Sequence, residues 1–332
     1  MLRFLGEPVR RRDFISLLGT VATLYSTRSR AQQRGKTYLI GYLAIAEIPY
    51  GMKALKDGLR KLGYIEGQNL KVEYRIVAAG GASVDTLAAE LVELGPDIII
   101  AVGTSATIAA KRATATIPIV MTPVADPLRA GIVTNLAHPD GNITGTMLYS
   151  SELAGKRVDV FKQAVPEIAR IAVLGAGESP VTRVLWPETQ NAVQSLRLEA
   201  RLFTVRAPAE LPATFEAIAQ DNANGLLVLA DPMLNAARKS IIALAASHRL
   251  PAIYEDREFV QDGGLISYGP SIAEMMRRSA AFVDKILKGA HPSELPIEQP
   301  TDYELLINLT TAKALGLTIS DKMLTVADDV IE

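Results

Sequence analysis

The stretch that most constrains the fold runs from Pro96 to Pro127, where two apolar runs flank a segment of small residues. The first run, Asp97 to Val102, is rich in Ile and Val and predicts a strand that is buried on both faces. The small residues 106–114 predict a closely packed helix, and Ile119 to Met121 predict the next parallel strand. This order of elements is a βαβ unit, and open sheets built from such units bind ligands at the carboxyl ends of their strands.

The same order of elements returns roughly 130 residues later in Gly225 to Glu255, and the strands that begin near Tyr38 and Arg170 have a similar offset. A period of this length corresponds to a whole lobe, and the 332 residues are enough for two lobes that each bury a core. The sequence therefore predicts an α/β fold of two similar doubly wound lobes with parallel sheets. The lobes should be joined by a multi-strand hinge and separated by a cleft.

We expect the chain to cross between the lobes more than once, which would restrict their relative motion to a hinge. The N-terminal lobe is predicted to comprise residues 37–147 and about 269–300, and the C-terminal lobe residues 148–268 and about 301–332. The amphipathic segment Ile272 to Leu287 predicts a long helix that returns over the first lobe. A short helix is expected between Pro127 and Leu136.

Residues 1–31 have the pattern of an export signal. Three arginines, Arg10 to Arg12, precede an uncharged and fairly apolar segment, Ile15 to Thr27, and a small-x-small site that ends at Ala31. Paired arginines before Phe14 and Ile15 resemble a twin-arginine signal. The apolar segment is shorter than the ~20 residues that span a membrane. We therefore expect cleavage near Ala31 and a soluble periplasmic protein without membrane insertion, with a disordered basic tail as the alternative.

The composition and motifs exclude several classes of site. The chain has no cysteine, so disulfides, thiolate metal sites and cysteine catalysis are ruled out. The first 31 residues hold six basic and two acidic side chains, which leaves 29 basic and 34 acidic ones in a body that does not suit nucleic acid. The glycines in Gly175 to Pro180 lack the spacing of a dinucleotide loop, the three histidines lie far apart, and no Gly-x-Ser-x-Gly motif occurs. We predict no cofactor, no metal and no catalytic residue.

Thr104 and Ser105 are candidate ligand donors, because they follow a buried strand and open a helix whose first amides favour an anion. An ordinary helix cap is the alternative. Asp126 and Asp231 each precede a proline after an apolar strand, so each is a candidate for binding a cation or for capping a helix. Donors on one lobe and a carboxylate on the other would suit a zwitterion.

Tyr42 and Tyr254 lie near the carboxyl ends of predicted strands in a chain with only 5% aromatic residues. Such side chains can stack on a flat ligand or donate a hydrogen bond through the hydroxyl. Packing in the core with a solvated hydroxyl is the alternative for both.

Several motifs together resemble the ABC transporter substrate-binding proteins of the tryptophan/tyrosine-type family. They are GYIEGQN (63–69), GTSAT (103–107), IPIV (117–120), ADP (125–127), HPDGNITG (138–145) and GGLISYG (263–269). The resemblance implies a type I periplasmic binding fold that closes on a small ligand, often an aromatic amino acid. It implies delivery to an ABC permease with a separate ATPase, and ligand contacts at Thr104, Ser105, Val124 to Asp126, Asp231, Tyr254 and the loop after Tyr42. That loop, Ala44 to Gly51, departs from the family pattern.

The leading hypothesis is thus an exported solute receptor without catalysis, expected to be a monomer. A ligand-sensing regulator with the same two-lobe core is one alternative, although a DNA-binding helix-turn-helix would then be expected where the export signal stands. An enzyme that acts in the cleft is the other alternative, and it lacks a recognisable nucleophile or base pair.

Overall fold

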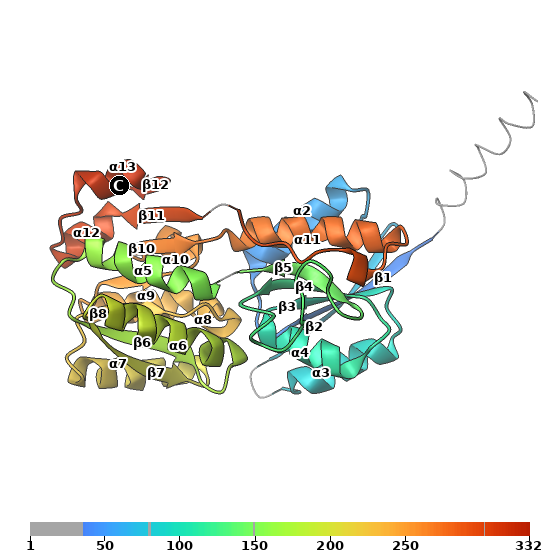
Figure 1. The fold of residues 1–332 in the computed structure, drawn as a ribbon, viewed down its shortest axis with the longest axis horizontal. Helices are drawn as coiled ribbons and strands as arrows, with labels where there is room; N and C mark the ends of the chain where they lie inside the picture. The colour runs from blue at the N-terminus through green and yellow to red at the C-terminus, as the bar shows by residue number, and fades with distance from the viewer. Residues whose placement is uncertain (1–35, 79–80, 149, 302) are drawn as a thin grey trace, which may run out of the picture.

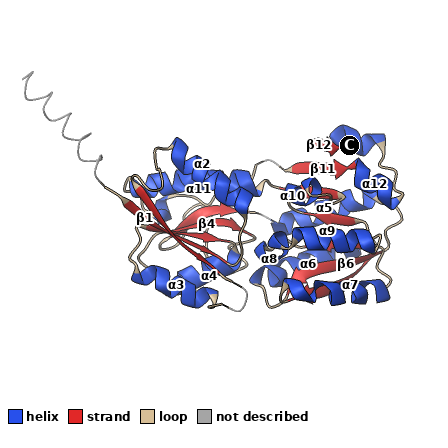
Figure 2. Ribbon diagram, turned by 180° about the vertical axis from the view of Figure 1, so that it is seen from behind, coloured by secondary structure: helices blue, strands red, loops and turns tan. Residues whose placement is uncertain are grey.

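The computed structural model describes residues 36–332 except 79, 80, 149 and 302. The predicted export signal lies outside the described residues. The described chain forms two α/β lobes side by side, and helices cover both faces of each sheet (Figure 1, Figure 2). No helix in the described part of the chain has the length and apolar character needed to cross a membrane. The predicted fold class is confirmed.

The N-terminal lobe is a five-stranded parallel sheet in the order β2-β1-β3-β4-β5. Its strands are β1 (Tyr38–Ala44), β2 (Leu70–Ile76), β3 (Ile98–Val102), β4 (Ile119–Val124) and β5 (Ile143–Met147). Its helices are α2 (Pro49–Lys61), α3 (Val84–Glu93), α4 (Thr104–Ala113) and α11 (Ile272–Leu287). The predicted βαβ unit is β3, α4 and β4, and every residue of β3 is buried as its apolar sequence requires.

The C-terminal lobe is a seven-stranded sheet in the order β12-β11-β10-β9-β8-β6-β7. Its strands are β6 (Arg170–Ala176), β7 (Glu199–Val205), β8 (Gly225–Val228), β9 (Ala252–Tyr254), β10 (Ile266–Gly269), β11 (Glu304–Asn308) and β12 (Asp329–Ile331). Only β11 runs antiparallel to its neighbour β10 among the described strand pairs. Its helices are α5 (Ser150–Ala164), α6 (Pro180–Ser195), α7 (Leu211–Gln220), α8 (Pro232–Ala236), α9 (Arg238–Ser247), α10 (Arg257–Gln261), α12 (Leu309–Leu315) and α13 (Asp321–Val326), with the 3-10 turn η1 (Pro208–Glu210). The second 3-10 turn, η2 (Pro292–Glu294), packs beside β5 of the N-terminal lobe.

Helix α11 leaves the C-terminal lobe and packs beside α2 on the N-terminal lobe, as predicted (Figure 1). Its apolar side chains, including Met276, Phe282 and Val283, join the cluster between α2 and the sheet. Ser271 caps the helix by accepting a hydrogen bond from the Glu274 amide at 3.3 Å. The two helices approach closely because α2 presents glycine to α11.

Replacing Gly58 by alanine should destabilise the protein by about 2 kcal/mol, because overpacking a tight contact costs about 1–3 kcal/mol. The new Cβ would lie 2.8 Å from the Arg277 carbonyl oxygen and 2.9 Å from the Ala280 Cβ. Urea unfolding measures the effect. Gly155→Ala in α5 is the matched control, since its Cβ meets no atom within 4 Å, and it should leave stability unchanged or raise it. Equal effects of the two substitutions would contradict this account.

The segment after Pro127 is a turn, so the short helix predicted to reach Leu136 is wrong. Asp126 Oδ1 accepts hydrogen bonds from the amides of Leu128 and Arg129 at 3.1 and 3.0 Å, which begins a helical turn. Gly131 then has a φ of 68°, and this left-handed conformation ends the turn before a helix can form.

The chain passes between the lobes three times: from β5 to α5, from β10 to α11 and from η2 to β11. The third passage runs beside the end of β5, because the Met147 amide donates to the Glu298 carbonyl at 3.0 Å and the Glu298 amide to the Gly145 carbonyl at 2.9 Å. These paired connections form the hinge region.

Candidate functional site

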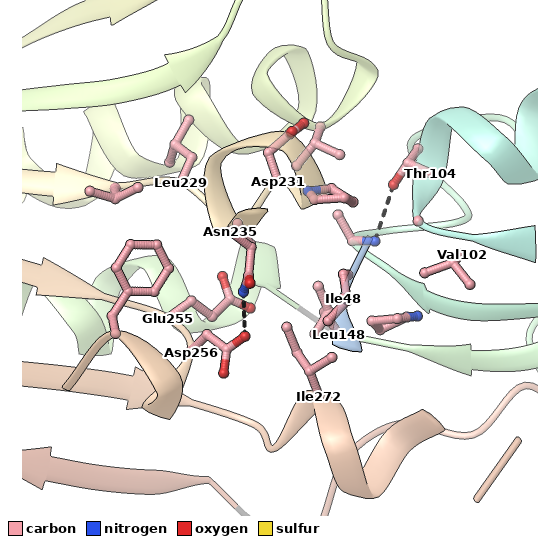
Figure 3. Close-up of a pocket in the computed structure, with 18 residues that line it drawn as sticks. Ile48, Val102, Thr104, Leu148, Leu229, Asp231, Asn235, Glu255, Asp256 and Ile272 are labelled. Atoms are coloured by element: carbon pink, nitrogen blue, oxygen red, sulfur yellow. Dashed lines mark hydrogen bonds between the residues drawn. The ribbon is translucent and has the colours of Figure 1, made fainter. Parts of the chain in front are cut away.

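A cavity lies between the lobes, at the carboxyl ends of their strands (Figure 3). Its walls are mostly apolar, and its polar side chains come mainly from the C-terminal lobe. The N-terminal lobe contributes Ile48, Val102, Gly103, Thr104, Pro123, Ala125, Leu148 and Ile272; the C-terminal lobe contributes Val181, Val228, Leu229, Ala230, Asp231, Pro232, Asn235, Glu255, Asp256 and Phe259. The free volume is about 40 Å³, which holds a few water molecules and is too small for an amino acid.

The start of α4 faces this cavity without a side-chain cap. Gly103 is the N-cap residue, with a φ of 84°, and it has no side chain that could satisfy the first amides. Thr104 and Ser105 are the first residues inside the helix, so neither hydroxyl is its cap. Thr104 is 1% exposed and lines the cavity, and its Oγ1 accepts a hydrogen bond from the Ala125 amide at 3.3 Å (Figure 3). The hydroxyl hydrogen of Thr104 can therefore be donated to a ligand.

Asp231 lines the opposite wall and is only 5% exposed. It caps α8, since Oδ1 accepts from the Met233 amide at 2.8 Å, and Oδ2 accepts from the Ser179 hydroxyl at 2.8 Å. Burial raises the pKa of this carboxyl, and the hydrogen bonds from Ser179, Met233 and Leu234 only partly oppose the shift. The Asp231 side chain thus both caps α8 and lines the cavity.

Asp256 and Asn235 form the second polar group of the cavity. The Asn235 Nδ2 donates to Asp256 Oδ2 at 2.5 Å (Figure 3), and Asn235 Oδ1 is buried with no hydrogen-bond partner among the described residues. Asp256 also accepts a hydrogen bond from the Tyr50 hydroxyl, which belongs to the N-terminal lobe. Burial and the neighbouring Asp256 raise the pKa of Glu258 well above its usual range.

Three further contacts join the lobes beside the Tyr50 hydrogen bond. A Cβ built on Gly103 would lie 3.0 Å from Pro232 Cγ, so the backbone of one lobe touches the other. Arg129 forms an ion pair with Glu188 of α6. The Arg238 guanidinium lies 5.7 Å from the Tyr50 ring centroid. The lobes are therefore closed around the small cavity.

A family model described as ABC transporter substrate binding protein matches residues 47–331. The chain belongs to this family. Its members bind small molecules outside the cytoplasm for an ABC transporter, and this chain is a solute-binding protein of that kind. The resemblance found in the sequence is thereby confirmed.

Three relatives illustrate what this solute-binding protein is similar to. A tyrosine-binding protein from Clostridioides difficile (strain R20291) is 24% identical over 295 residues, which cover 88% of this chain and 85% of the relative. A conserved domain protein from Vibrio cholerae is 27% identical with a TM-score of 0.82, covering 89% of this chain and 100% of that one. An ABC domain from Streptococcus pneumoniae in complex with L-Trp is 24% identical with a TM-score of 0.81, at 89% and 100% coverage.

Two of the seven predicted site residues of this solute-binding protein, Thr104 and Asp231, line the interlobe cavity. Ser105 is half-buried beside Thr104 in α4. Val124 lies in the core of the N-terminal lobe, and Asp126 holds the turn after β4. For Ser105, Val124 and Asp126, ligand contact stays a sequence prediction.

The two predicted tyrosines lie in other parts of the molecule. Tyr254 is 1% exposed and stacks on Phe259, with ring centroids 4.4 Å apart, in the core of the C-terminal lobe. Tyr42 lies under α2 in the N-terminal lobe and lines a separate cavity. Ligand contact in the cleft stays a sequence prediction for both.

Three residues of the site were not predicted from the sequence: Asn235, Glu255 and Asp256. Tyr50 lies in the loop Ala44 to Gly51, where the family resemblance implies ligand contacts. Glu255 and Asp256 directly follow Tyr254, so their position at the carboxyl end of a predicted strand was an available signal. Asn235 lies on a helix, and no local pattern distinguishes it from a surface residue. No group of three His, Cys, Asp or Glu side chains in the described part of the chain is placed to hold a metal ion.

Glu255 forms an ion pair with Arg157 below the cavity. The Arg157 Nη2 lies 3.1 Å from Glu255 Oε2, and the two side chains are 2% and 3% exposed. Arg157 Nε also donates to the Tyr268 carbonyl at 3.0 Å. Helix α5, which carries Arg157, follows the first passage between the lobes, and Tyr268 precedes the second. The contacts of Arg157 therefore hold both connections against the C-terminal lobe.

Proposed function

We propose that this protein captures an α-amino acid with a large apolar side chain, aromatic in the first instance, for an ABC importer, by binding alone and without a chemical step. The observation that carries the proposal is the arrangement of Thr104 and Asp231. A hydroxyl at an uncapped helix start and a buried carboxylate lie on opposite lobes and line one apolar cavity. A zwitterion carries the two charges that this arrangement complements.

The ligand ammonium would bind Asp231. The hydrogen-bond partners of this carboxylate among the described residues, the Ser179 hydroxyl and the Met233 amide, are neutral, so a cation would supply a charge partner. The ligand carboxylate would bind the first amides of α4 and the Thr104 hydroxyl, where the helix dipole favours an anion by roughly 0.3–2 kcal/mol.

The side chain of the ligand would contact the apolar wall. Ile48, Leu148 and Ile272 face Leu229 across the cavity (Figure 3). Phe259 also lines it, so both lobes contribute to the wall. The names of two relatives support a large aromatic side chain, because one is called a tyrosine-binding protein and one is described in complex with L-Trp.

Binding requires the lobes to open and close, since the closed cavity of about 40 Å³ cannot admit such a ligand. We propose that lobes with the boundaries expected from the sequence move about the three passages. Ligand would shift the population toward a closed form with a wider cavity than the one described above, because it touches both lobes only when they close on it. The transporter would recognise that closed form.

We also propose how the protein reaches the ligand and which proteins it serves. Residues 1–31 would direct export and be removed near Ala31, which leaves a soluble periplasmic monomer. Its protein partners would be the permease and the ATPase subunits of the importer.

Replacing Tyr50 by phenylalanine should weaken ligand binding about tenfold, because a hydrogen bond to a carboxylate contributes about 1.5–3 kcal/mol and this one exists only in the closed form. Calorimetric titration measures the affinity, and small-angle X-ray scattering should show a more open ligand-free molecule. Tyr64→Phe is the matched control, since that hydroxyl donates to Asp284 at 3.0 Å within one lobe. An unchanged affinity for Y50F would refute the role of Tyr50 in closure.

The proposed function is tested by thermal denaturation of residues 32–332 with the common amino acids, small carboxylates, purines and sugars. A ligand at ~100 times its dissociation constant adds about 2.7 kcal/mol of stability. We expect stabilisation by tryptophan, tyrosine or phenylalanine. Tryptamine and indole-3-propionate lack one charge each and should stabilise far less. Equal stabilisation by indole-3-propionate and tryptophan would show that no zwitterion is recognised.

A further inference from the structure

A second cavity lies inside the N-terminal lobe, between α2 and the β2 edge of the sheet; we call it the α2 cavity. Its volume is about 320 Å³, more than twice the roughly 150 Å³ of an engineered cavity that binds benzene. It shares no lining residue with the interlobe cavity. It is lined by Ile40, Tyr42, Met52, Leu55, Lys56, Leu59, Arg60, Tyr64, Ile65, Glu66, Leu70, Val72, Tyr74 and Ile100.

Tyr42 lines the α2 cavity and carries a buried hydroxyl. Tyr42 is 1% exposed, and no described residue forms a hydrogen bond with its hydroxyl. Buried tyrosine hydroxyls usually find a partner, and an unsatisfied one costs about 1–3 kcal/mol. Burial, with smaller contributions from Tyr74 and Glu47, raises the pKa of Tyr42, so the hydroxyl stays neutral and can donate or accept.

The walls of the α2 cavity suit a flat apolar molecule. Leu55, Leu59 and Ile100 are buried in the surrounding cluster, and the Tyr74 ring is tilted by 52° to the Tyr42 ring, with centroids 5.4 Å apart. Apolar and aromatic walls around one hydrogen-bonding group are typical of small-molecule sites.

Charged side chains mark the opening of the α2 cavity. Lys56 pairs with Glu66 at 3.1 Å and lies 5.0 Å from the Tyr74 ring centroid, and both side chains are about 40% exposed. The exposed Arg60 lies one turn further along α2. Because Lys56 and Glu66 neutralise each other, the opening favours an uncharged molecule.

We propose that the α2 cavity binds a small uncharged aromatic molecule with one hydroxyl or amino group, which forms a hydrogen bond with Tyr42. The phenol class meets all of these requirements: one ring would fill the apolar part, and its hydroxyl would pair with that of Tyr42. This site is separate from the cleft that receives the transported solute.

The test uses 4-fluorophenol and fluorobenzene as probes, with ¹⁹F NMR titration of residues 32–332. We expect 4-fluorophenol to bind, and Tyr42→Phe to weaken it about fivefold, as one neutral hydrogen bond predicts, with no loss of fluorobenzene binding. In protein labelled at methyl groups, 4-fluorophenol should shift Leu55, Leu59 and Val72 and leave Val181 and Leu229 of the cleft unchanged.

Two filling variants separate the cavities. Val72→Phe narrows the α2 cavity and should abolish binding of both probes, while Ala230→Phe fills the interlobe cavity and should leave probe binding intact. The proposal is overturned if wild-type protein binds neither probe at millimolar concentration. It is also overturned if the probes shift only the methyl groups of the cleft, or if Ala230→Phe alone abolishes their binding.

Discussion

Asp231→Asn should weaken amino-acid binding about 100-fold and leave the ligand-free protein as stable as the wild type or more stable. The loss follows from removal of the buried charge that would pair with the ligand ammonium, since truncating a buried charge pair costs about 2–5 kcal/mol or more. Asparagine keeps an oxygen that can accept from the Met233 amide, so the cap of α8 is retained.

The stability part of this prediction follows from the raised pKa of Asp231. Between the unfolded and the native pKa values, the native protein holds a proton that the unfolded chain has lost. Stability therefore falls as the pH rises from the unfolded pKa toward the native pKa. The uncharged amide of the Asp231→Asn variant would carry no such penalty, so the melting temperature at pH 7 should not fall.

Affinity from calorimetry and melting temperature without ligand together test Asp231→Asn. Asp140→Asn is the matched control, because Asp140 also accepts from a backbone amide, that of Thr134 at 3.1 Å, and does not line the interlobe cavity. Its affinity should stay within about threefold of the wild type, as for a substitution outside the binding interface. If the two variants bind equally well, Asp231 does not hold the ammonium.

Arg157→Met should lower the free energy of unfolding by about 3–5 kcal/mol, the usual cost of leaving one member of a buried ion pair without its partner. Glu255 would lose its cationic neighbour at 3.1 Å, and the Tyr268 carbonyl would lose a donor at 3.0 Å. Because Glu255 lines the cavity, ligand affinity should fall as well.

Urea unfolding of three variants separates the charge effect from simple loss of packing. The double variant Arg157→Met with Glu255→Leu should recover most of the stability, because apolar replacement of a whole buried pair is often neutral. Arg112→Gln removes an exposed ion pair with Asp85 at 3.6 Å and should change stability by less than about 1 kcal/mol. A loss below about 1 kcal/mol for Arg157→Met would show that the pair is solvated.

The fold was predictable because its elements repeat a strong local pattern. The buried run in β3, the small residues of α4 and the amphipathic α11 each carry a period or composition that few other structures fit. The turn after Pro127 was not predictable, because a single left-handed glycine, Gly131, decides it. One small-residue helix was expected between β8 and β9, and the chain forms the two helices α8 and α9, which break near Ala237.

The site was predictable only where it follows a strand. Thr104 and Asp231 lie directly beyond β3 and β8, where the sheet topology places ligand groups. The loop Ala44 to Gly51 departs from the family pattern, and it supplies Ile48 to the cavity and Tyr50 to the contact between the lobes. The sequence marked this loop as unusual and could not show which of its residues reach the other lobe, because that depends on how the lobes close.

The return of α11 to the N-terminal lobe has a consequence for the order in which the molecule can fold. Residues 37–147 form the five-stranded sheet, but the helix that completes its apolar cover is encoded after nearly the whole C-terminal lobe. The first half of a growing chain therefore holds an open apolar surface until Ile272–Leu287 has been synthesised. The C-terminal lobe can assemble its strands β6 to β10 without interruption, so most of its sheet can form before the N-terminal lobe receives its last helix.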